Sequence, residues 1–169
     1  ESEVPYYRGE RILCNFPPTA ATSLNALFFS GLYHGMTEIV DPRVTEKDLY
    51  EQITKCKPNV LISTGSMLET FFDRIERELE AGKVFDFNFA HMWIIGGEGT
   101  EKKKLLHWNE ILKRCGGQEL FNGYGCSEVF SVLSVDTFKD FSNKDDKKTW
   151  TVTSFTEQGI ICRECTVGG

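Results

Sequence analysis

The sequence contains no apolar run that approaches the roughly 20 residues needed to cross a bilayer as a helix. Residues 1–5, Glu-Ser-Glu-Val-Pro, do not show the basic and apolar pattern of a signal peptide. Basic residues are also few, since 19 Lys and Arg stand against 25 Asp and Glu and give a net charge of −6. This balance disfavours a nucleic-acid or anionic-membrane surface. We therefore expect no nucleic acid and no membrane among the partners, and a cytoplasmic location.

The six cysteines do not form a pattern typical of a disulfide framework. Cys14 and Cys56 lie in apolar or helical segments and Cys126 lies in a glycine-rich stretch, which indicates reduced thiols of a cytosolic protein. Cys162 and Cys165 have the C-x-x-C spacing of a redox or zinc site, but no second pair of suitable spacing and no nearby histidine accompany them. A zinc module around this pair is a minor alternative that metal analysis would test.

The length of 169 residues is enough for one domain with a real core and too short for two ordinary domains. Apolar runs predict strands at residues 11–16, 36–40, 59–63, 91–95 and 119–121, and the segments between them predict helices at residues 20–34, 45–56, 66–81 and 100–115. This alternation implies right-handed crossovers and a mostly parallel sheet with helices on both faces. We predict a single α/β subdomain over residues 1–169, a Rossmann-like three-layer sandwich.

Local signals predict where several of these elements begin. Residues 45–48 and 66–69 both have the pattern of a capping box, and Thr100 is expected to cap the last helix. The helix at residues 20–34 carries apolar residues at helical spacing, namely Leu24, Leu27, Phe28 and Leu32. Near the C-terminus, residues 150–153 and 159–162 predict an antiparallel pair at the edge of the sheet.

The stretch Asn122-Gly-Tyr-Gly-Cys-Ser-Glu128 combines features that suit a nucleotide. Its glycines allow a sharp bend and the close approach of a ligand. Tyr124 offers a flat face for a base, Ser127 a hydroxyl for a phosphate oxygen, and Glu128 a hard oxygen ligand for Mg²⁺. The stretch follows a predicted strand, and ligands of parallel sheets bind beyond the carboxyl ends of strands. A glycine-rich turn with a surface glutamate is the plainer interpretation of the same residues.

Residues 122–128 resemble the Tyr-Gly-x-(Thr/Ser)-Glu signature of the adenylate-forming enzymes, which include acyl- and aryl-CoA ligases, luciferases and peptide-synthetase adenylation domains. A second segment, Ile94-Ile95-Gly96-Gly97-Glu98-Gly99, lies 25 to 30 residues upstream. It resembles the Gly-Gly-(Glu/Ala)-Pro segment of the same family. The two motifs occur in the family's order with a helix-like stretch between them, and together they are more specific than either motif alone.

The resemblance implies roles for single residues. Tyr124 would stack on the adenine of ATP or AMP, and Asn122 with Gly123 would approach the amino edge of the base. Ser127 stands where the family usually has Thr and would bond the α-phosphate. Glu128 would help to hold Mg²⁺, which neutralises charge as pyrophosphate leaves.

A second group of residues would complete the nucleotide slot. Gly97, Glu98 and Gly99 would line its other wall, and Gly125 with Cys126 would lie near the carboxylate that attacks the α-phosphorus. Ordinary structural roles remain open for two of the key side chains. Tyr124 could be a half-buried core ring, and Glu98 could be a carboxylate favoured by the dipole at the start of a helix.

The resemblance covers roughly residues 11–130 and several family segments have no counterpart here. These are the phosphate loop, the ribose-binding Asp, the C-terminal domain with its catalytic Lys, and a His expected near Ala20. The resemblance therefore implies a central piece of the large N-terminal domain of an ATP-dependent ligase. Its parent would convert a carboxylic acid and ATP to an acyl-adenylate and pass the acyl group to CoA or a carrier thiol.

The chain alone is expected to be inactive, because it lacks preorganised positive charge that is worth several kcal/mol of barrier. Apolar surface that normally packs on neighbouring subdomains would be exposed, which predicts a homo-oligomer. The alternative function is a non-catalytic nucleotide-binding or interaction module with the same fold.

Overall fold

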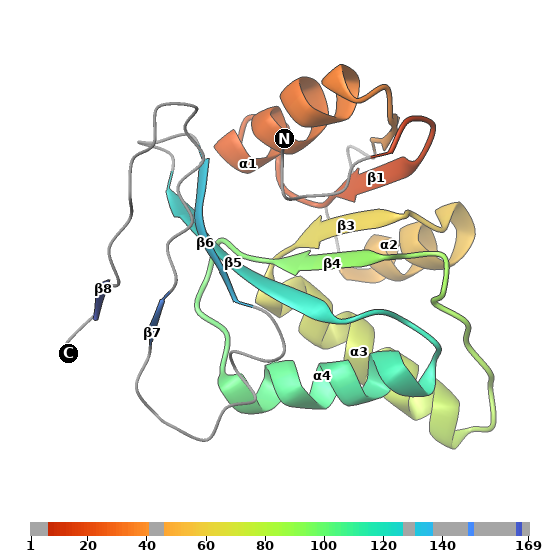
Figure 1. Ribbon diagram of the computed structural model, residues 1–169. Helices are drawn as coiled ribbons and strands as arrows, with labels where there is room; N and C mark the ends of the chain where they lie inside the picture. Colours follow the sequence, from red (N-terminus) through yellow and green to blue (C-terminus); the bar gives the residue numbers. More distant parts are fainter. Residues whose placement is uncertain (1–6, 41–45, 127–130, 137–148, 151–164, 167–169) are drawn as a thin grey trace.

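The computed structural model describes residues 7–40, 46–126, 131–136, 149–150 and 165–166. Its centre is a six-stranded sheet with the order β2-β1-β3-β4-β5-β6 (Figure 1). The strands are β1 (Arg11–Cys14), β2 (Thr37–Ile39), β3 (Val60–Ser63), β4 (Met92–Ile95), β5 (Leu120–Cys126) and β6 (Ser131–Asp136). Strands β1 to β5 pair in parallel and β6 is antiparallel to β5. The predicted α/β fold with a mostly parallel sheet is confirmed.

Helices cover both faces of this sheet and make three layers (Figure 1). The helical elements are α1 (Ala21–Ser23), which continues into the π-helix η1 (Leu24–Gly31), α2 (Glu46–Glu51), which continues into the π-helix η2 (Gln52–Cys56), α3 (Gly65–Glu80) and α4 (Lys102–Arg114). The α1–η1 segment lies on one face, and α3 and α4 lie together on the other.

The strands form because their side chains are apolar on both faces. In β3, Leu61 packs into the core cluster under α3 and α4, while Val60 and Ile62 pack into a second cluster that includes Leu27 of η1. All four residues of β3 are buried. A continuous apolar run of this kind is what a strand covered on both sides requires.

The described sheet has an antiparallel edge. The edge strand is β6, which was not predicted, and the pairing of β7 (Thr149–Trp150) with β8 (Cys165–Thr166) forms a separate two-stranded sheet. Residues 151–153 and 159–162, which were expected to form the edge pair, lie outside the residues that the structure describes. The partner of β5 comes directly after it in the chain, and the pair expected at residues 150–153 and 159–162 stays a prediction.

The apolar pattern of residues 20–34 also predicts burial incorrectly. Leu27 is 4% exposed, but Phe28 is 47% exposed and Leu32 is 61% exposed. Side chains spaced three or four residues apart in this segment therefore do not all face the sheet.

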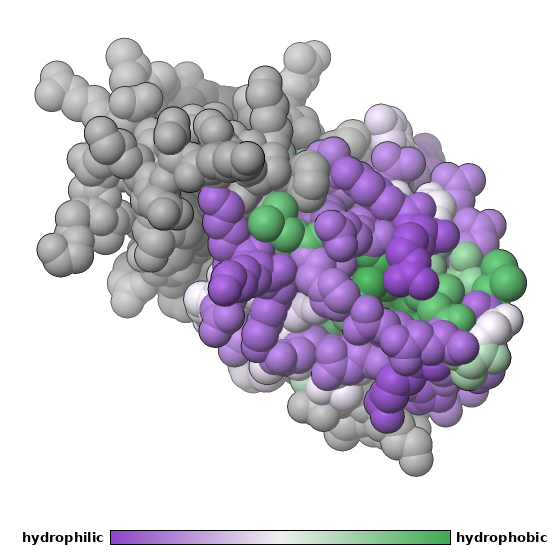
Figure 2. All heavy atoms as spheres, turned by 90° about the horizontal axis from the view of Figure 1, so that it is seen from below, coloured by the Kyte–Doolittle hydropathy of each residue, from purple (hydrophilic) through white to green (hydrophobic). Residues whose placement is uncertain are grey.

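The layer of α3 and α4 presents a mainly hydrophilic outer surface (Figure 2). On α3, Glu78 accepts a hydrogen bond from the Tyr50 hydroxyl at 2.6 Å and lies 3.1 Å from both Arg74 and Lys83. The hydrogen bond from Tyr50 is the main cause that lowers the pKa of Glu78 to about 2.

Two further observations concern the chemistry of the chain. Among the helices that the structure describes, none is both long and apolar enough to cross a membrane. Cys14, Cys56 and Cys115 are free thiols. Burial raises the pKa of Cys14 and of Cys115.

Candidate functional site

The carboxyl ends of the parallel strands meet at one edge of the sheet, where the loops after β1, β3 and β4 lie close together (Figure 1). The chain passes from β1 to β2 on one side and then crosses back to β3 on the other side of β1, so the strand order reverses between β1 and β3. In open α/β sheets ligands bind at such a point. Here Asn15 and Ser63 are both buried, and the Ser63 hydroxyl donates a hydrogen bond to Asn15 Oδ1 at 3.3 Å.

The two glycine motifs are brought together at this edge. Ile95 at the end of β4 pairs with Asn122 of β5. One residue further on, a Cβ atom on Gly96 would lie only 2.9 Å from the carbonyl oxygen of Gly123. The backbones of the two motifs therefore touch, and only glycine at residue 96 permits this approach.

Gly97 and Gly99 differ in what surrounds them. Gly97 has φ +80°, and a Cβ atom there would lie 2.8 Å from the ring of Phe16. Phe16 thus fills the space that the missing side chain of Gly97 leaves. Gly99 has no neighbouring atom within 4 Å of the corresponding position and is open.

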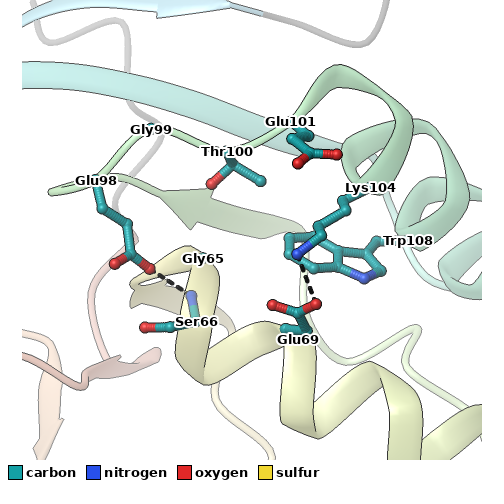
Figure 3. Close-up of a pocket in the computed structure, with 9 residues that line it drawn as sticks. All are labelled: Gly65, Ser66, Glu69, Glu98, Gly99, Thr100, Glu101, Lys104 and Trp108. Atoms are coloured by element: carbon teal, nitrogen blue, oxygen red, sulfur yellow. Dashed lines mark hydrogen bonds and ion pairs between the residues drawn. The ribbon is translucent and has the colours of Figure 1, made fainter.

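Glu98 is held by the start of α3. Its carboxylate accepts a hydrogen bond from the backbone N–H of Ser66 (Figure 3). The Thr64 hydroxyl accepts a second one from the N–H of Met67 at 3.4 Å. The expected alternative role of Glu98 as a helix-start carboxylate is found, but at α3 and not at α4, which follows Glu98 in the chain.

Both predicted helix caps in this region were wrong. The cap of α3 is Thr64 and not Ser66, while Glu69 pairs with Lys104 at 2.6 Å instead of closing a capping box. At α4 the N-cap position belongs to Glu101. Thr100 instead packs over the start of α3, and its buried hydroxyl oxygen has no hydrogen-bond partner among the described residues. Residue 45, the predicted cap of α2, lies outside the described residues.

A pocket of about 220 Å³ opens between the loop after β4 and the first turns of α3 and α4 (Figure 3). Its lining includes the carboxylates of Glu69, Glu98 and Glu101 and one ammonium group, that of Lys104. The hydrogen bond to Glu69 raises the pKa of Lys104. The excess of negative charge makes the pocket unfavourable for a phosphate group and better suited to a neutral or cationic group.

Residues 122–126 of the second motif are extended and do not form the glycine-rich turn of the plainer interpretation. Strand β5 continues from Leu120 to Cys126, because β6 pairs with it, and the register shifts between Tyr124 and Gly125. Asn122 and Gly123 are partly buried and Gly125 is exposed. The side chains of Tyr124 and Cys126 lie outside what the structure describes.

Ser127 and Glu128 also lie outside the described residues. Among the residues that are described, no group of three or more His, Cys, Asp or Glu side chains could hold a metal ion. The expected contact of Mg²⁺ with Glu128 stays a prediction.

Sequence reasoning missed several residues at this edge. Asn15, Phe16 and Thr64 directly follow β1 and β3, and Gly65 begins α3. Their position immediately after a predicted parallel strand was the signal that could have identified them.

A model of the AMP-binding enzyme family matches residues 2–163. No curated protein sequence gives a significant match. Among solved structures, a long-chain-fatty-acid-CoA ligase from Archaeoglobus fulgidus is similar with a TM-score of 0.67 at 11% identity, over 81% of this chain and 27% of that chain. The o-succinylbenzoate CoA synthetase of Bacillus subtilis is similar with a TM-score of 0.66 at 18% identity, over 84% and 27% of the two chains.

The adenylation domain AlmE of Vibrio cholerae, in complex with glycyl-adenosine-5′-phosphate, has a TM-score of 0.62 at 18% identity, over 79% of this chain and 24% of that chain. Another structure of the Bacillus subtilis synthetase contains ATP and a magnesium ion, and covers 77% and 24% of the two chains with a TM-score of 0.56 at 20% identity. The chain thus spans about a quarter of the length of these structures. At these identities the likeness establishes the fold.

Proposed function

The chain belongs to the family of AMP-binding enzymes, and we propose that it forms the adenine and Mg²⁺ side of the nucleotide site in an ATP-dependent acid–thiol ligase. One observation carries the proposal: the backbones of Gly96 and Gly123 touch, so the two motifs that resemble the family's nucleotide segments lie at the same sheet edge. Because ligands bind at this edge in parallel sheets, a nucleotide between the motifs has a physical basis.

In this proposal the base lies between the loop after β4 and the end of β5. Tyr124 stacks on adenine, and Asn122 and Gly123 approach its amino edge. Gly99, which has no atom near its missing side chain, leaves room for the nucleotide on the opposite wall. Ser127 donates a hydrogen bond to an oxygen of the α-phosphate.

The proposed reaction has two steps. A substrate carboxylate oxygen attacks the α-phosphorus of ATP, and the bond between the α-phosphorus and the oxygen that bridges it to the β-phosphate breaks. Pyrophosphate departs, and the acyl-adenylate is formed. A thiolate of CoA or of a carrier then attacks the acyl carbon, and AMP leaves as the thioester forms. Mg²⁺, when bound near Glu128, would neutralise phosphate charge. Such substrates and reduced thiols are consistent with a cytoplasmic protein.

Titration of the ¹⁵N-labelled chain with AMP, followed by NMR, tests the binding role. We expect a dissociation constant on the order of 1 mM for the wild type and for Tyr7→Ala, a control at a side chain that is 58% exposed and lies outside both motifs. Tyr124→Ala should bind at least about tenfold more weakly, because base–aromatic stacking is worth roughly 1–3 kcal/mol. Equal affinity of Tyr124→Ala and the control would contradict the proposal.

The complete reaction is assigned to the longer enzyme and not to these 169 residues. The chain spans about a quarter of the related structures. We expect no pyrophosphate release when the isolated chain is mixed with ATP and carboxylic acids. Turnover by the isolated chain would contradict the assignment of the complete reaction to a longer enzyme.

A non-catalytic module is the second candidate, and two contacts favour it. Phe16 fills the space beside Gly97, and Glu98 is already bonded to Ser66. Both contacts stabilise the loop after β4 without any ligand. The absence of AMP binding by the wild-type chain would select this function.

We also propose that the chain self-associates through the helical segment on its outer face. Phe28, Phe29, Leu32 and Tyr33 are 47%, 62%, 61% and 86% exposed. Neighbouring exposed apolar side chains of this size mark surfaces that bind other surfaces. A homodimer that covers them would remove this area from water.

A further inference from the structure

The loop after β4 rests directly on the first turn of α3. A Cβ atom on Gly65 would overlap the hydroxyl oxygen of Thr100 and would lie 3.3 Å from the carboxylate of Glu98. The first residue of α3 therefore has to be glycine for the loop to reach this position. Two side chains of the loop, from Glu98 and Thr100, meet over this one residue (Figure 3).

The carboxylate of Glu98 supplies what the start of α3 lacks. The first N–H groups of any helix have no partner within the helix, and the helix dipole favours negative charge beside them. α3 has 16 residues and carries no acidic residue in its own first turn. Glu98, which lies 32 residues further along the chain, accepts the hydrogen bond from Ser66 N–H.

The same loop contains Gly96 and Gly97, which form the glycine wall of the proposed nucleotide slot. Gly97 adjoins Glu98, has φ +80° and packs against Phe16. Gly96 is fixed on one side by a hydrogen bond from its N–H to the Ser63 carbonyl oxygen at 3.1 Å. The bond from Glu98 to α3 fixes the other side of Gly97, so the backbone of the wall is held at both ends.

We propose that Glu98 is a positioning residue: its carboxylate binds the N-terminus of α3 and thereby holds Gly96 and Gly97 in the arrangement that receives the nucleotide. That a nucleotide binds at this loop rests on the proposed function. The attachment of Glu98 to α3 does not depend on it. It assigns to Glu98 a role through the backbone of the loop, in place of the direct nucleotide contact that the sequence motif suggested.

The test compares three variants. Glu98→Gln keeps an oxygen that can accept the Ser66 hydrogen bond, Glu98→Ala removes it, and Glu101→Ala is the matched control. Glu101 is an exposed glutamate of the same loop whose side chain makes no capping hydrogen bond. Urea unfolding of each variant establishes that it is folded before any other measurement.

The first measurement is hydrogen exchange at the Ser66 amide, followed by NMR. We expect exchange to be about tenfold faster in Glu98→Ala, as loss of one typical helix cap implies, and nearly unchanged in Glu98→Gln and Glu101→Ala. Equal protection of the Ser66 amide in Glu98→Ala and in the wild type would overturn the attachment to α3, whatever the binding data show.

The second measurement is the AMP dissociation constant of the same proteins. We expect AMP to bind about tenfold more weakly to Glu98→Ala, because loss of one helix cap changes the free energy by about that factor. The dissociation constant of Glu98→Gln should be within about threefold of the wild-type value. Weak binding by Glu98→Gln with a protected Ser66 amide would mean that the carboxylate contacts the nucleotide, and would overturn the positioning role. No AMP binding by the wild type would instead defeat the proposed function, while the exchange data still decide the attachment.

Discussion

Replacement of Gly96 by alanine perturbs the closest approach between β4 and β5. The new Cβ atom would lie 2.9 Å from the Gly123 carbonyl oxygen, whereas ordinary contact begins at 3.4 Å. The strands would therefore have to separate by several tenths of an ångström. Gly96 cannot move freely toward β3, because its N–H donates to the Ser63 carbonyl oxygen at 3.1 Å. Both neighbours are backbone atoms, so no side chain can rotate away.

The magnitude follows from two opposing contributions. Overpacking in a tight site costs about 1–3 kcal/mol, while a glycine-to-alanine change stabilises by about 0.4–1 kcal/mol through the unfolded chain. We expect Gly96→Ala to lower the free energy of unfolding by about 1–2 kcal/mol. Gly99→Ala is the matched control, because no atom lies within 4 Å of its missing Cβ. This control should be neutral or slightly stabilised.

Urea unfolding followed by tryptophan fluorescence measures both variants. Trp93 and Trp108 are buried and report on the core that lies between the sheet and α3 and α4. The reasoning predicts the order Gly99→Ala, then wild type, then Gly96→Ala, from most to least stable. Equal unfolding free energies for the two variants would refute the claim that β4 and β5 touch at the candidate site.

Two further predictions concern charge and assembly. Glu78→Gln should be less stable than the wild type at neutral pH, because the pKa of Glu78 is lowered from 4.5 to about 2 in the folded state. The difference in unfolding free energy should be complete above pH 4.5 and should shrink as the pH falls toward 2. Urea unfolding at several pH values measures it. A difference that does not depend on pH would contradict the Tyr50–Glu78 interaction. Leu32→Glu should shift light scattering from a dimer toward the 19.2 kDa monomer, while Val84→Glu, a control at another exposed apolar residue, should not; a monomeric wild type would contradict self-association.

The parallel strands could be predicted because their signal is local and unambiguous. The run that forms β3 is apolar at every position of the strand except its last residue, Ser63, and it packs into cores on both faces. The antiparallel β6 and the extended form of β5 beyond Phe121 could not be predicted in the same way. Gly123 and Gly125 favour a turn when considered alone, and pairing with β6 overrides that preference.

The partners of Glu69 and Glu98 could not be predicted from sequence spacing because they are distant in the chain. Glu69 stands three residues after Ser66, as in a capping box, yet its carboxylate pairs with Lys104 of the next helix. Glu98 lies 32 residues after the amide that it binds. The local pattern identifies residues that can accept a hydrogen bond, but the packing of loop on helix decides which acceptor reaches which donor.

These same contacts restrict how a nucleotide can bind at this edge. The N-terminus of a long helix is ordinarily a site for phosphate, but at α3 the carboxylate of Glu98 already occupies it. Glu101 adds negative charge to the adjoining pocket, where Glu69 is paired with Lys104. A phosphate placed 4 Å from one such carboxylate would be repelled by about 4 kcal/mol at an effective dielectric constant near 20. In the proposed site we therefore expect ATP to turn its base toward the loop after β4 and to direct its phosphates toward the end of β5.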